Sequence, residues 1–459
     1  MTEIDSSTPE NDDAAAKPAE PTENKAVPAA PQEEEVNVPE LVVLAEMQKR
    51  PLPELYELGN ELRVRVSSRT KHQIIFDVLC FYSKRGTVIE AEGVIELKNE
   101  NSFGMLRTPS SSFRAQPDDI YVPAQTVREF GLRHGQQVKV QARAPRDREK
   151  YLSASRVLEV EGLPAEDYQA ATPFEHLTAM YPDRRIILEN SELKNAACRA
   201  VDLIAPLGMG QRGVIVAPPR GGKTILLKSI ASAIHANHPD VELVILLLDE
   251  RPEEVTDFRE TVNASVFSST FDENPKRHIE VAEFVLERAK RLVERGKDVV
   301  ILLDSLTRLA RGYNALASGG GGSMSGGLNS KALQKARTFF NSARNAEEGG
   351  SLTILATALV ETESKMDDII FEEFKGTGNM EIRLDREMAE RRLFPAIHFA
   401  QSATRKDDLL YHPDEMRRIN VARRQLAQLP APDAMQVLLK NIARTQNNTE
   451  LLLTGLQLR

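Results

Sequence analysis

Tryptophan is absent from the 459-residue chain, and cysteine occurs only at Cys80 and Cys198. The two cysteines stand far apart in the sequence and lack the spacing of metal ligands, so we expect buried thiols rather than a disulfide or a zinc site. No apolar run approaches the length that spans a membrane, and the N-terminus lacks the basic and apolar regions of a signal peptide. These absences favour a soluble protein that stays in the cytoplasm and has no membrane partner.

An excess of positive charge is also absent, because the formal net charge is −9. Residues 1–40 contain eleven acidic residues and two lysines, which give this segment a net charge of −9 by itself. The rest of the chain is therefore balanced in charge, and a basic groove is not excluded. Residues 1–38 have almost no large apolar side chains to offset the entropy of ordering, so we expect an acidic, disordered tail.

Two small modules are expected after this tail. In residues 39–85 the apolar positions recur at helical spacing, which predicts a helical module. In residues 86–160 five short β-like runs are separated by turn residues, which suits a small barrel of the oligonucleotide-binding (OB) type. Residues 161–195 are interpreted as a linker to the remainder of the chain.

Strands and helices alternate over residues 196–459. Amphipathic helical segments, such as residues 277–295, lie between apolar runs. This alternation is typical of an α/β domain in which helices cover a mainly parallel sheet. The chain is thus expected to be a multidomain protein. The strands of the last domain are expected at residues 213–217, 241–248, 298–303, 352–359 and 393–399.

A phosphate-binding loop follows the first of these strands. Residues 217–224 read Ala-Pro-Pro-Arg-Gly-Gly-Lys-Thr and precede a helix-like segment. Glycines let backbone N–H groups approach phosphates, and a helix N-terminus adds unpaired donors and partial positive charge. Lys223 would reach the β- and γ-phosphates, and the Thr224 hydroxyl would hold Mg²⁺. Ala217 replaces the usual first glycine, which leaves a chance loop as the alternative, but the preceding strand, the helix and the Lys-Thr pair favour a phosphate loop.

Two carboxylates stand at the ends of other apolar strands. Asp304 ends the run 299–304, where it would complete the Mg²⁺ shell; the alternative is a helix-capping Asp. Glu250 is the candidate base that orients the attacking water; the alternative is a solvated acidic turn. Hydrolysis of a nucleotide needs one carboxylate for the metal and another for the water, so the catalytic interpretation is favoured for both residues.

Aromatic and basic residues gather in the barrel region. They supply the stacking faces and the phosphate-directed charge that single-stranded nucleic acid requires, although half of the aromatics could form the barrel core instead. The glycine-rich residues 318–328 cannot form regular structure, and their position inside the α/β domain favours a mobile binding loop over a linker. The barrel residues concerned are Phe103, Arg107, Phe113, Tyr121, Arg143, Arg146, Arg148, Lys150 and Tyr151.

Five motifs closely resemble the bacterial transcription termination factor Rho family and occur in the order that this family has them. They are residues 217–224, 249–255 (Asp-Glu-Arg-Pro-Glu-Glu-Val), 302–311 (Leu-Leu-Asp-Ser-Leu-Thr-Arg-Leu-Ala-Arg), 348–354 (Glu-Gly-Gly-Ser-Leu-Thr-Ile) and 373–381 (Glu-Phe-Lys-Gly-Thr-Gly-Asn-Met-Glu). The resemblance extends from about residue 40 to the C-terminus. It implies a homohexameric ring of RecA-like domains that bind ATP between subunits and act as an RNA-dependent ATPase and 5′–3′ RNA helicase.

The resemblance also implies roles for single residues. The catalytic residues are Glu250, Lys223, Arg405 as the arginine finger, and Arg392 as a second arginine that faces the neighbouring nucleotide. The nucleotide contacts are Arg220, Gly221, Gly222, Lys223, Thr224, Ile225 and the adenine-stacking Phe394, while Thr224 and Asp304 hold Mg²⁺. The primary RNA site, which prefers pyrimidines, consists of Phe103, Arg107, Tyr121, Glu149 and Tyr151. The secondary RNA site in the pore includes Lys365, Ser323 and Met324.

Two departures from the family pattern concern RNA binding. Met105 replaces a second aromatic residue, which should weaken stacking, and Gly322 replaces a common lysine, so Lys365 should carry more of the phosphate contact in the pore. RNA polymerase and elongation factors are the partners that the resemblance implies, and release of transcripts from the polymerase is the expected function. The alternatives are a rotary-ATPase subunit and a non-catalytic RNA-binding assembly protein that uses ATP structurally.

Overall fold

The structure is a computed structural model that describes residues 38–99, 102–317 and 327–458. The tail that we expect to be disordered lies outside the described residues, as do Gly322, Ser323 and Met324 of the glycine-rich loop. Within the described ranges, no helix is both long and apolar enough to cross a membrane. Cys80 and Cys198 are free thiols; Cys198 is buried as expected, whereas Cys80 is half-buried, and partial burial raises the pKa of Cys80 to about 11.

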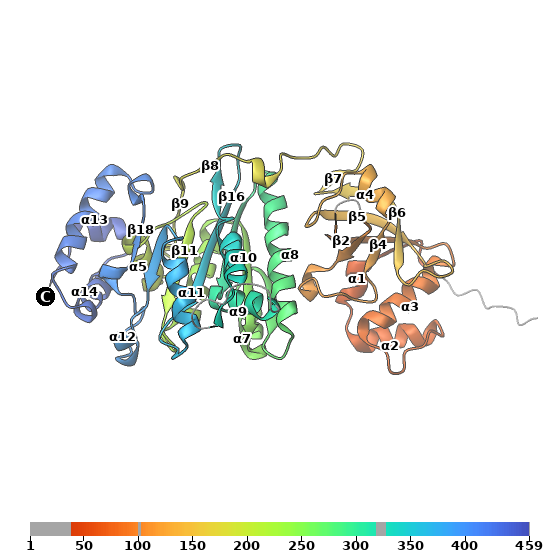
Figure 1. Ribbon diagram of the computed structural model, residues 1–459, viewed down its shortest axis with the longest axis horizontal. Helices are drawn as coiled ribbons and strands as arrows, with labels where there is room; N and C mark the ends of the chain where they lie inside the picture. The colour runs from red at the N-terminus through yellow and green to blue at the C-terminus, as the bar shows by residue number, and fades with distance from the viewer. Residues whose placement is uncertain (1–37, 100–101, 318–326, 459) are drawn as a thin grey trace, which may run out of the picture. The chain divides into compact units, whose positions relative to one another are not determined.

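The helical module contains α1 (Leu44–Lys49), α2 (Leu52–Glu61) and α3 (Lys71–Ser83) (Figure 1). Helix α3 begins at a capping box, in which the Thr70 hydroxyl accepts from the N–H of Gln73 and the Gln73 side chain accepts from the N–H of Thr70. The helical prediction is wrong for the first apolar residues, which form strand β1 (Leu41–Val43). β1 pairs in parallel with a barrel strand, and its two β-branched valines favour the extended backbone.

The predicted small barrel is present. Its strands follow the order β1-β2-β3-β4-β6-β5, and the additional pairing of β2 with β5 closes the sheet. Side chains alternate between the interior and the surface, as in β5, where Val138, Val140 and Ala142 are buried. The elements are β2 (Val88–Leu97), β3 (Gly104–Arg107), β4 (Ile120–Val122), α4 (Ala124–Glu129), β5 (Gln137–Arg143), β6 (Leu152–Val160) and β7 (Leu163–Pro164), which pairs with β6.

The α/β domain is built on a nine-stranded sheet in the order β13-β12-β14-β16-β11-β17-β18, with β15 and β8 attached through β16. All strands from β13 to β17 along this path are parallel, whereas β18 is antiparallel to β17. The predicted mainly parallel sheet is therefore confirmed. The strands are β8 (Ala179–Met180), β11 (Arg212–Ala217), β12 (Glu242–Glu250), β13 (Ser265–Thr270), β14 (Asp298–Asp304), β15 (Arg344–Ala346), β16 (Ser351–Leu359), β17 (Met380–Arg383) and β18 (Ala403–Thr404).

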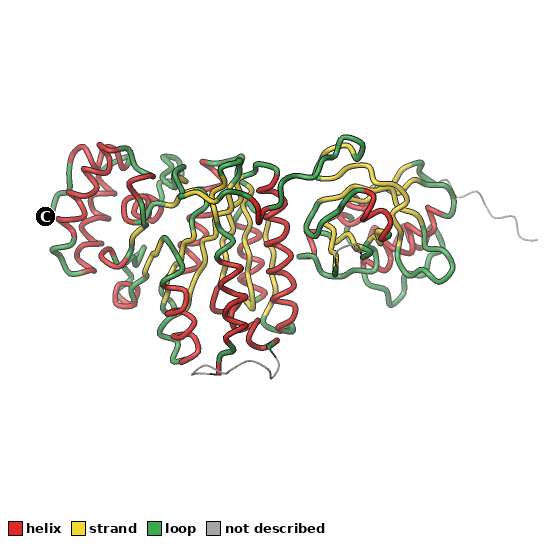
Figure 2. Tube along the Cα trace, turned by 45° about the horizontal axis from the view of Figure 1, so that its top comes forward, coloured by secondary structure: helices red, strands yellow, loops and turns green. Residues whose placement is uncertain are grey.

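Helices cover both faces of this sheet (Figure 2). In β11, Ile215 packs in one core with α5, α6 and α14, whereas Val214 and Val216 pack in another with α8, α9, α10 and α11. Successive residues of a strand point to opposite faces, which explains why these strands are apolar throughout. The helices are α5 (Ala196–Ile204), α6 (Lys223–Asn237), α7 (Pro252–Thr261), α8 (Pro275–Glu294), α9 (Leu306–Leu316), α10 (Ser330–Phe340), α11 (Lys365–Lys375), α12 (Arg386–Glu390), α13 (Pro413–Leu426), α14 (Ala431–Arg444) and α15 (Asn448–Thr454).

The hydrophobic pattern fails at one predicted strand and misses five strands of the large sheet, which are β8, β13, β15, β17 and β18. Residues 393–399 form no strand, and only Ile397 makes an isolated bridge, to Leu384. Pro395 interrupts this run because it has no N–H to donate to a ladder. The sheet instead contains β13 and β17, whose mixtures of polar and apolar residues do not form a long apolar run.

The segment interpreted as a linker contributes short strands of its own. β8 pairs with β15 at the margin of the large sheet, and β9 (Arg185–Ile186) pairs with β10 (Leu207–Gly208). Phe174 is buried, and its backbone N–H donates to Glu294 of α8 at 2.7 Å. Part of this segment therefore packs onto the α/β domain.

Candidate nucleotide and RNA sites

The phosphate loop connects β11 to α6 at the carboxyl edge of the parallel strands. Arg220 and Gly222 have left-handed backbone, with φ of 61° and 88°. A Cβ atom added at Gly222 would lie 3.1 Å from the ring of Phe394, so both conformation and space favour glycine there. The loop leads into the 15-residue helix α6, whose first N–H groups have no acceptor within the helix and can bind phosphate.

Lys223 lies between the two predicted carboxylates. Its Nζ donates to Asp304 Oδ1 at 2.7 Å and lies 3.9 Å from Glu250 Oε2. Asp304 ends β14 and is buried, and its Oδ1 also accepts from the Thr357 hydroxyl at 2.8 Å. The fold thus brings Lys223, Asp304 and Glu250 from three separate elements into one cluster at the phosphate loop.

The electrostatics of this cluster suit the predicted chemistry. Burial, followed by the negative charge of Asp304, raises the pKa of Glu250, while Lys223 opposes this shift. A raised pKa makes the ionised carboxylate a stronger base. Thr224 follows Lys223 at the start of α6, so a hydroxyl and the Asp304 carboxylate are both available at the loop. These residues fit Mg²⁺, which takes one or two protein ligands and fills its other positions with water and phosphate oxygens.

Sequence reasoning missed the side chains that hold the backbone beside Glu250. Asp249 has a left-handed φ of 53°, and its carboxylate pairs with Arg308 at 2.7 Å. His278 approaches from α8, with Nε2 4.0 Å from the same carboxylate and Nδ1 2.9 Å from the Ser269 hydroxyl. Burial lowers the pKa of His278 and so favours its neutral ring. Two adjacent acids were visible in the sequence, but only the fold separates the one that faces Lys223 from the one that is bound elsewhere.

A pocket of about 570 Å³ next to the phosphate loop contains the residues that we expect around the nucleotide base. Arg220, Arg392 and Phe394 all line it. Phe394 is 39% exposed, which leaves its ring open for stacking. Arg392 lies beside the loop of its own chain, and its role towards a neighbouring nucleotide stays a prediction.

Arg405 lies near the opposite end of the strands from the phosphate loop. It follows β18, which pairs with the start of β17, and the start of β17 pairs with the start of β11. The phosphate loop follows the other end of β11, which is six residues long and so spans about 20 Å. The backbone N–H of Arg405 donates to Asn379 at 2.8 Å, and its side chain is exposed. Arg405 therefore does not reach the phosphate loop of its own chain.

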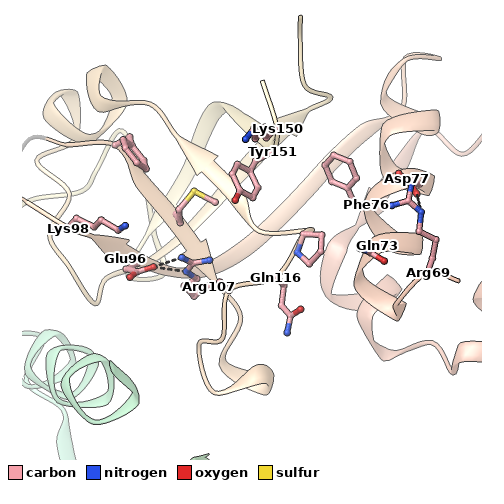
Figure 3. Close-up of a pocket in the computed structure, with 14 residues that line it drawn as sticks. Arg69, Gln73, Phe76, Asp77, Glu96, Lys98, Arg107, Gln116, Lys150 and Tyr151 are labelled. Carbon is pink, nitrogen blue, oxygen red and sulfur yellow. Dashed lines mark hydrogen bonds and ion pairs between the residues drawn. The ribbon is translucent and has the colours of Figure 1, made fainter. Parts of the chain in front are cut away.

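Exposed aromatic rings gather on the barrel, as predicted for RNA binding. Phe103 stacks on Tyr121, with ring centroids 5.3 Å apart and planes at 29°. Phe103 and Tyr151 are 44% and 41% exposed, and both line a pocket of about 710 Å³ (Figure 3). Met105 lines the same pocket but offers no ring. By contrast, Phe113 is buried, but it stacks on Phe267 of β13 and Phe284 of α8 rather than in the barrel core that the sequence left as the alternative.

Arg107 is held by carboxylates rather than left free for phosphate. Its Nε donates to Glu96 at 2.7 Å, and its Nη1 pairs with Asp119 (Figure 3 shows the contact with Glu96). Asp119 is buried, and desolvation raises its pKa to about 6 despite the arginine. Glu149 makes two hydrogen bonds with Arg143, at 2.7 and 2.9 Å, which lower the pKa of Glu149 to about 2. The roles of Arg107 and Glu149 towards RNA stay predictions.

Lys365 begins α11 and is exposed. Two residues later, Asp367 makes paired hydrogen bonds with Arg311 of α9, both at 2.8 Å. The start of α11 is therefore anchored to α9 while Lys365 stays accessible. Its predicted companions Ser323 and Met324 lie outside the described residues, so the secondary RNA site stays a prediction.

Comparison with known proteins identifies two functional parts. Residues 197–404 match the ATP synthase alpha/beta family, nucleotide-binding domain, and residues 91–166 match the Rho termination factor, RNA-binding domain. A solved structure of a prototypical ATPase from the type III secretion system of pathogenic bacteria superposes with a TM-score of 0.51 at 23% identity. The match covers 61% of this chain and 86% of that chain and shows a shared fold. Fold and sites together define a phosphate-loop ATPase that carries an RNA-binding domain.

Two relatives of similar length show which family of phosphate-loop ATPases this chain resembles. The transcription termination factor Rho of Akkermansia muciniphila is 56% identical over 440 residues, which are 96% of this chain and 92% of the relative. The transcription termination factor Rho of Pseudomonas aeruginosa is 47% identical over 89% of this chain and 98% of the relative. The chain belongs to the transcription termination factor Rho family. The family prediction is confirmed, and the RNA-binding domain distinguishes the chain from a rotary-ATPase subunit.

Proposed function

We propose that this chain hydrolyses ATP in response to RNA, moves along single-stranded RNA from 5′ to 3′ and releases transcripts from RNA polymerase. The observation that carries the proposal is the cluster of Lys223, Asp304 and Glu250 at the phosphate loop, in a chain that also has an RNA-binding domain. The cellular role is supported by the relatives, which are named transcription termination factor Rho.

Each residue of the cluster has a distinct task. Lys223 and the N-terminus of α6 bind the β- and γ-phosphates of ATP, which requires Lys223 to exchange Asp304 for phosphate oxygens. Thr224 and Asp304 hold Mg²⁺, which, when bound, neutralises charge on the phosphate oxygens. Glu250 orients the attacking water and accepts its proton, a task that its raised pKa suits. Phe394 stacks on the adenine in the neighbouring pocket.

A second subunit completes the site. Because Arg405 is separated from its own phosphate loop by the length of β11, we expect it to stabilise the transferring phosphoryl group of a neighbour. Such a contact is head-to-tail, and repeated head-to-tail contacts form a ring when the rotation between neighbours closes. The proposed assembly is the homohexamer that the family resemblance implies, with Arg392 as the second arginine at the nucleotide.

RNA would bind at two places. Phe103, Tyr121 and Tyr151 offer stacking surfaces on the barrel, where pyrimidines are the expected bases. Lys365 would contact phosphates in the pore, together with Ser323 and Met324. RNA polymerase and elongation factors are the proposed protein partners.

The test is ATP hydrolysis by the full chain with and without a cytosine-rich single-stranded RNA. We expect little turnover without RNA and strong stimulation with it, in a Mg²⁺-dependent reaction. Equal turnover under both conditions would contradict RNA-dependent hydrolysis. RNA binding without any turnover would support the non-catalytic assembly protein.

A further inference from the structure

The pocket that Phe103 and Tyr151 line has a wall that the RNA-binding domain does not supply. The pocket measures about 710 Å³, within the range that holds a ligand of nucleotide size. Phe103, Met105 and Tyr151 belong to residues 91–166, which match the RNA-binding domain. The opposite wall consists of α3 and the residue just before its cap, through Arg69, Gln73, Phe76 and Asp77 (Figure 3).

The α3 wall offers the same two kinds of contact as the barrel wall. Phe76 presents an aromatic ring to the pocket that Tyr151 also lines, so flat surfaces are available on both sides. Arg69 adds a positive charge to those of Lys98 and Lys150 around the same pocket. The Arg69 Nε forms an ion pair with Asp77 Oδ2 at 3.6 Å, beyond hydrogen-bond distance. This ion pair uses one of the three guanidinium nitrogens, so the guanidinium keeps donors for a second anion.

The pairing of Arg107, which also lines the pocket, increases the importance of the α3 wall. Arg107 is already bound by Glu96 and Asp119. A phosphate at the pocket therefore has its accessible positive partners at the rim, at Lys98 and Lys150 on the barrel and at Arg69 beside α3.

We propose that helix α3 is the second wall of the RNA site, and that Phe76 stacks on a base and Arg69 binds a phosphate of the same single strand. The inference deepens the proposed function, because it rests on RNA binding at the exposed barrel aromatics. Because Phe103 and Tyr151 line the pocket together with cationic side chains, the pocket offers both the stacking faces and the phosphate contacts that single-stranded RNA requires.

The first experiment measures binding of the full chain to fluorescent oligocytidine RNA by anisotropy. Phe76→Leu should weaken binding on the order of fivefold to tenfold through the lost stacking face, whereas Phe76→Tyr keeps the ring and should bind like the parent. Phe81→Leu is the matched control, because Phe81 also lies on α3 but contacts Arg85 rather than the pocket. Thermal melting and basal ATPase activity verify that each variant is folded.

The second experiment repeats the titration over a range of salt concentrations. Arg69→Gln should lower the slope of log affinity against log salt by about 0.7, the value for one phosphate contact on a single strand. Arg65→Gln, an exposed neighbour outside the pocket, should leave the slope unchanged. If Phe76→Leu and Arg69→Gln both keep the affinity and salt slope of the parent while Phe103→Ala binds more weakly, the proposal that α3 contacts RNA is overturned. RNA binding at the barrel aromatics would then still stand. Unchanged binding in Phe103→Ala as well would instead overturn RNA binding at the barrel aromatics.

Discussion

The ammonium group of Lys223 donates to Oδ1 of Asp304 at 2.7 Å, so the lysine predicted to bind phosphate is paired with the carboxylate predicted to bind Mg²⁺. The Lys223 ammonium also lies 3.9 Å from Glu250 and offsets part of the repulsion between the two acids. ATP and Mg²⁺ would replace this pair with two new ones, lysine with phosphate and aspartate with metal. Lys223 and Asp304 would thus each have a partner of opposite charge before and after nucleotide binding.

Lys223→Ala should abolish ATP hydrolysis while RNA binding persists, because the lost charge serves the γ-phosphate and the barrel does not depend on it. Lys228→Ala is the matched control, since Lys228 lies on the same helix but pairs with Asp257. Hydrolysis and RNA anisotropy, measured on the same preparation, test the prediction. Normal turnover in Lys223→Ala would remove the phosphate role.

Glu250→Gln should bind ATP and Mg²⁺ but turn over about 100-fold more slowly or worse, because the amide keeps the shape and loses the basicity. In the parent, the pKa of Glu250 is raised, and the base acts only when ionised. The rate should therefore fall on the acid side at a higher pH than an ordinary glutamate would give, and this limb should be absent in Glu250→Gln. A pH–rate profile checks both points, with Glu253→Gln as the control; equal loss of ATP affinity would instead assign Glu250 to binding.

Arg107→Ala should destabilise the barrel on the order of 3 kcal/mol, because it leaves the buried Asp119 without its cation. The folded-state pKa of Asp119, about 6, exceeds its ordinary value of 3.8, so ionisation of Asp119 opposes folding. The free-energy cost of burying the ionised carboxylate therefore grows as pH rises through this window. Removal of Arg107 raises that pKa further, and the variant should lose more stability at pH 8 than at pH 5. Denaturant melts at both pH values test this, with the exposed Arg156→Ala as control; equal stability of parent and variant would contradict a structural role.

Arg405→Ala should bind ATP and assemble yet hydrolyse about 1000-fold more slowly or worse, as expected for loss of an arginine finger. Arg417→Ala, an exposed arginine on α13, should behave like the parent. If the finger acts on a neighbour, a mixture of Arg405→Ala and Lys223→Ala subunits should regain RNA-stimulated turnover, since about a quarter of random head-to-tail contacts are intact. Subunit exchange must be demonstrated separately. Undiminished turnover in Arg405→Ala rings would disprove the finger.

The chemically distinctive parts of this chain can be predicted from sequence. The phosphate loop is recognisable because its glycines, lysine and threonine are consecutive, so local geometry alone constrains them. The apolar strands β11, β12, β14 and β16 follow from burial on both faces, which leaves an uninterrupted apolar run. Where local pattern and burial diverge, as at Pro395 or in the polar β13, the same reasoning fails.

The contacts between distant residues depend on the tertiary structure. Lys223 and Asp304 are 81 residues apart, and strand order and register place them in contact. The same sheet order puts Arg405 at the far end of β11 from the phosphate loop, and packing of α3 beside the barrel brings Phe76 to the pocket of Tyr151. The family, the phosphate loop and the candidate residues can be recognised from the sequence, because these depend on the identity and order of neighbouring residues. Their distances, pairings and pKa shifts depend on packing between distant segments, which local periodicity does not encode.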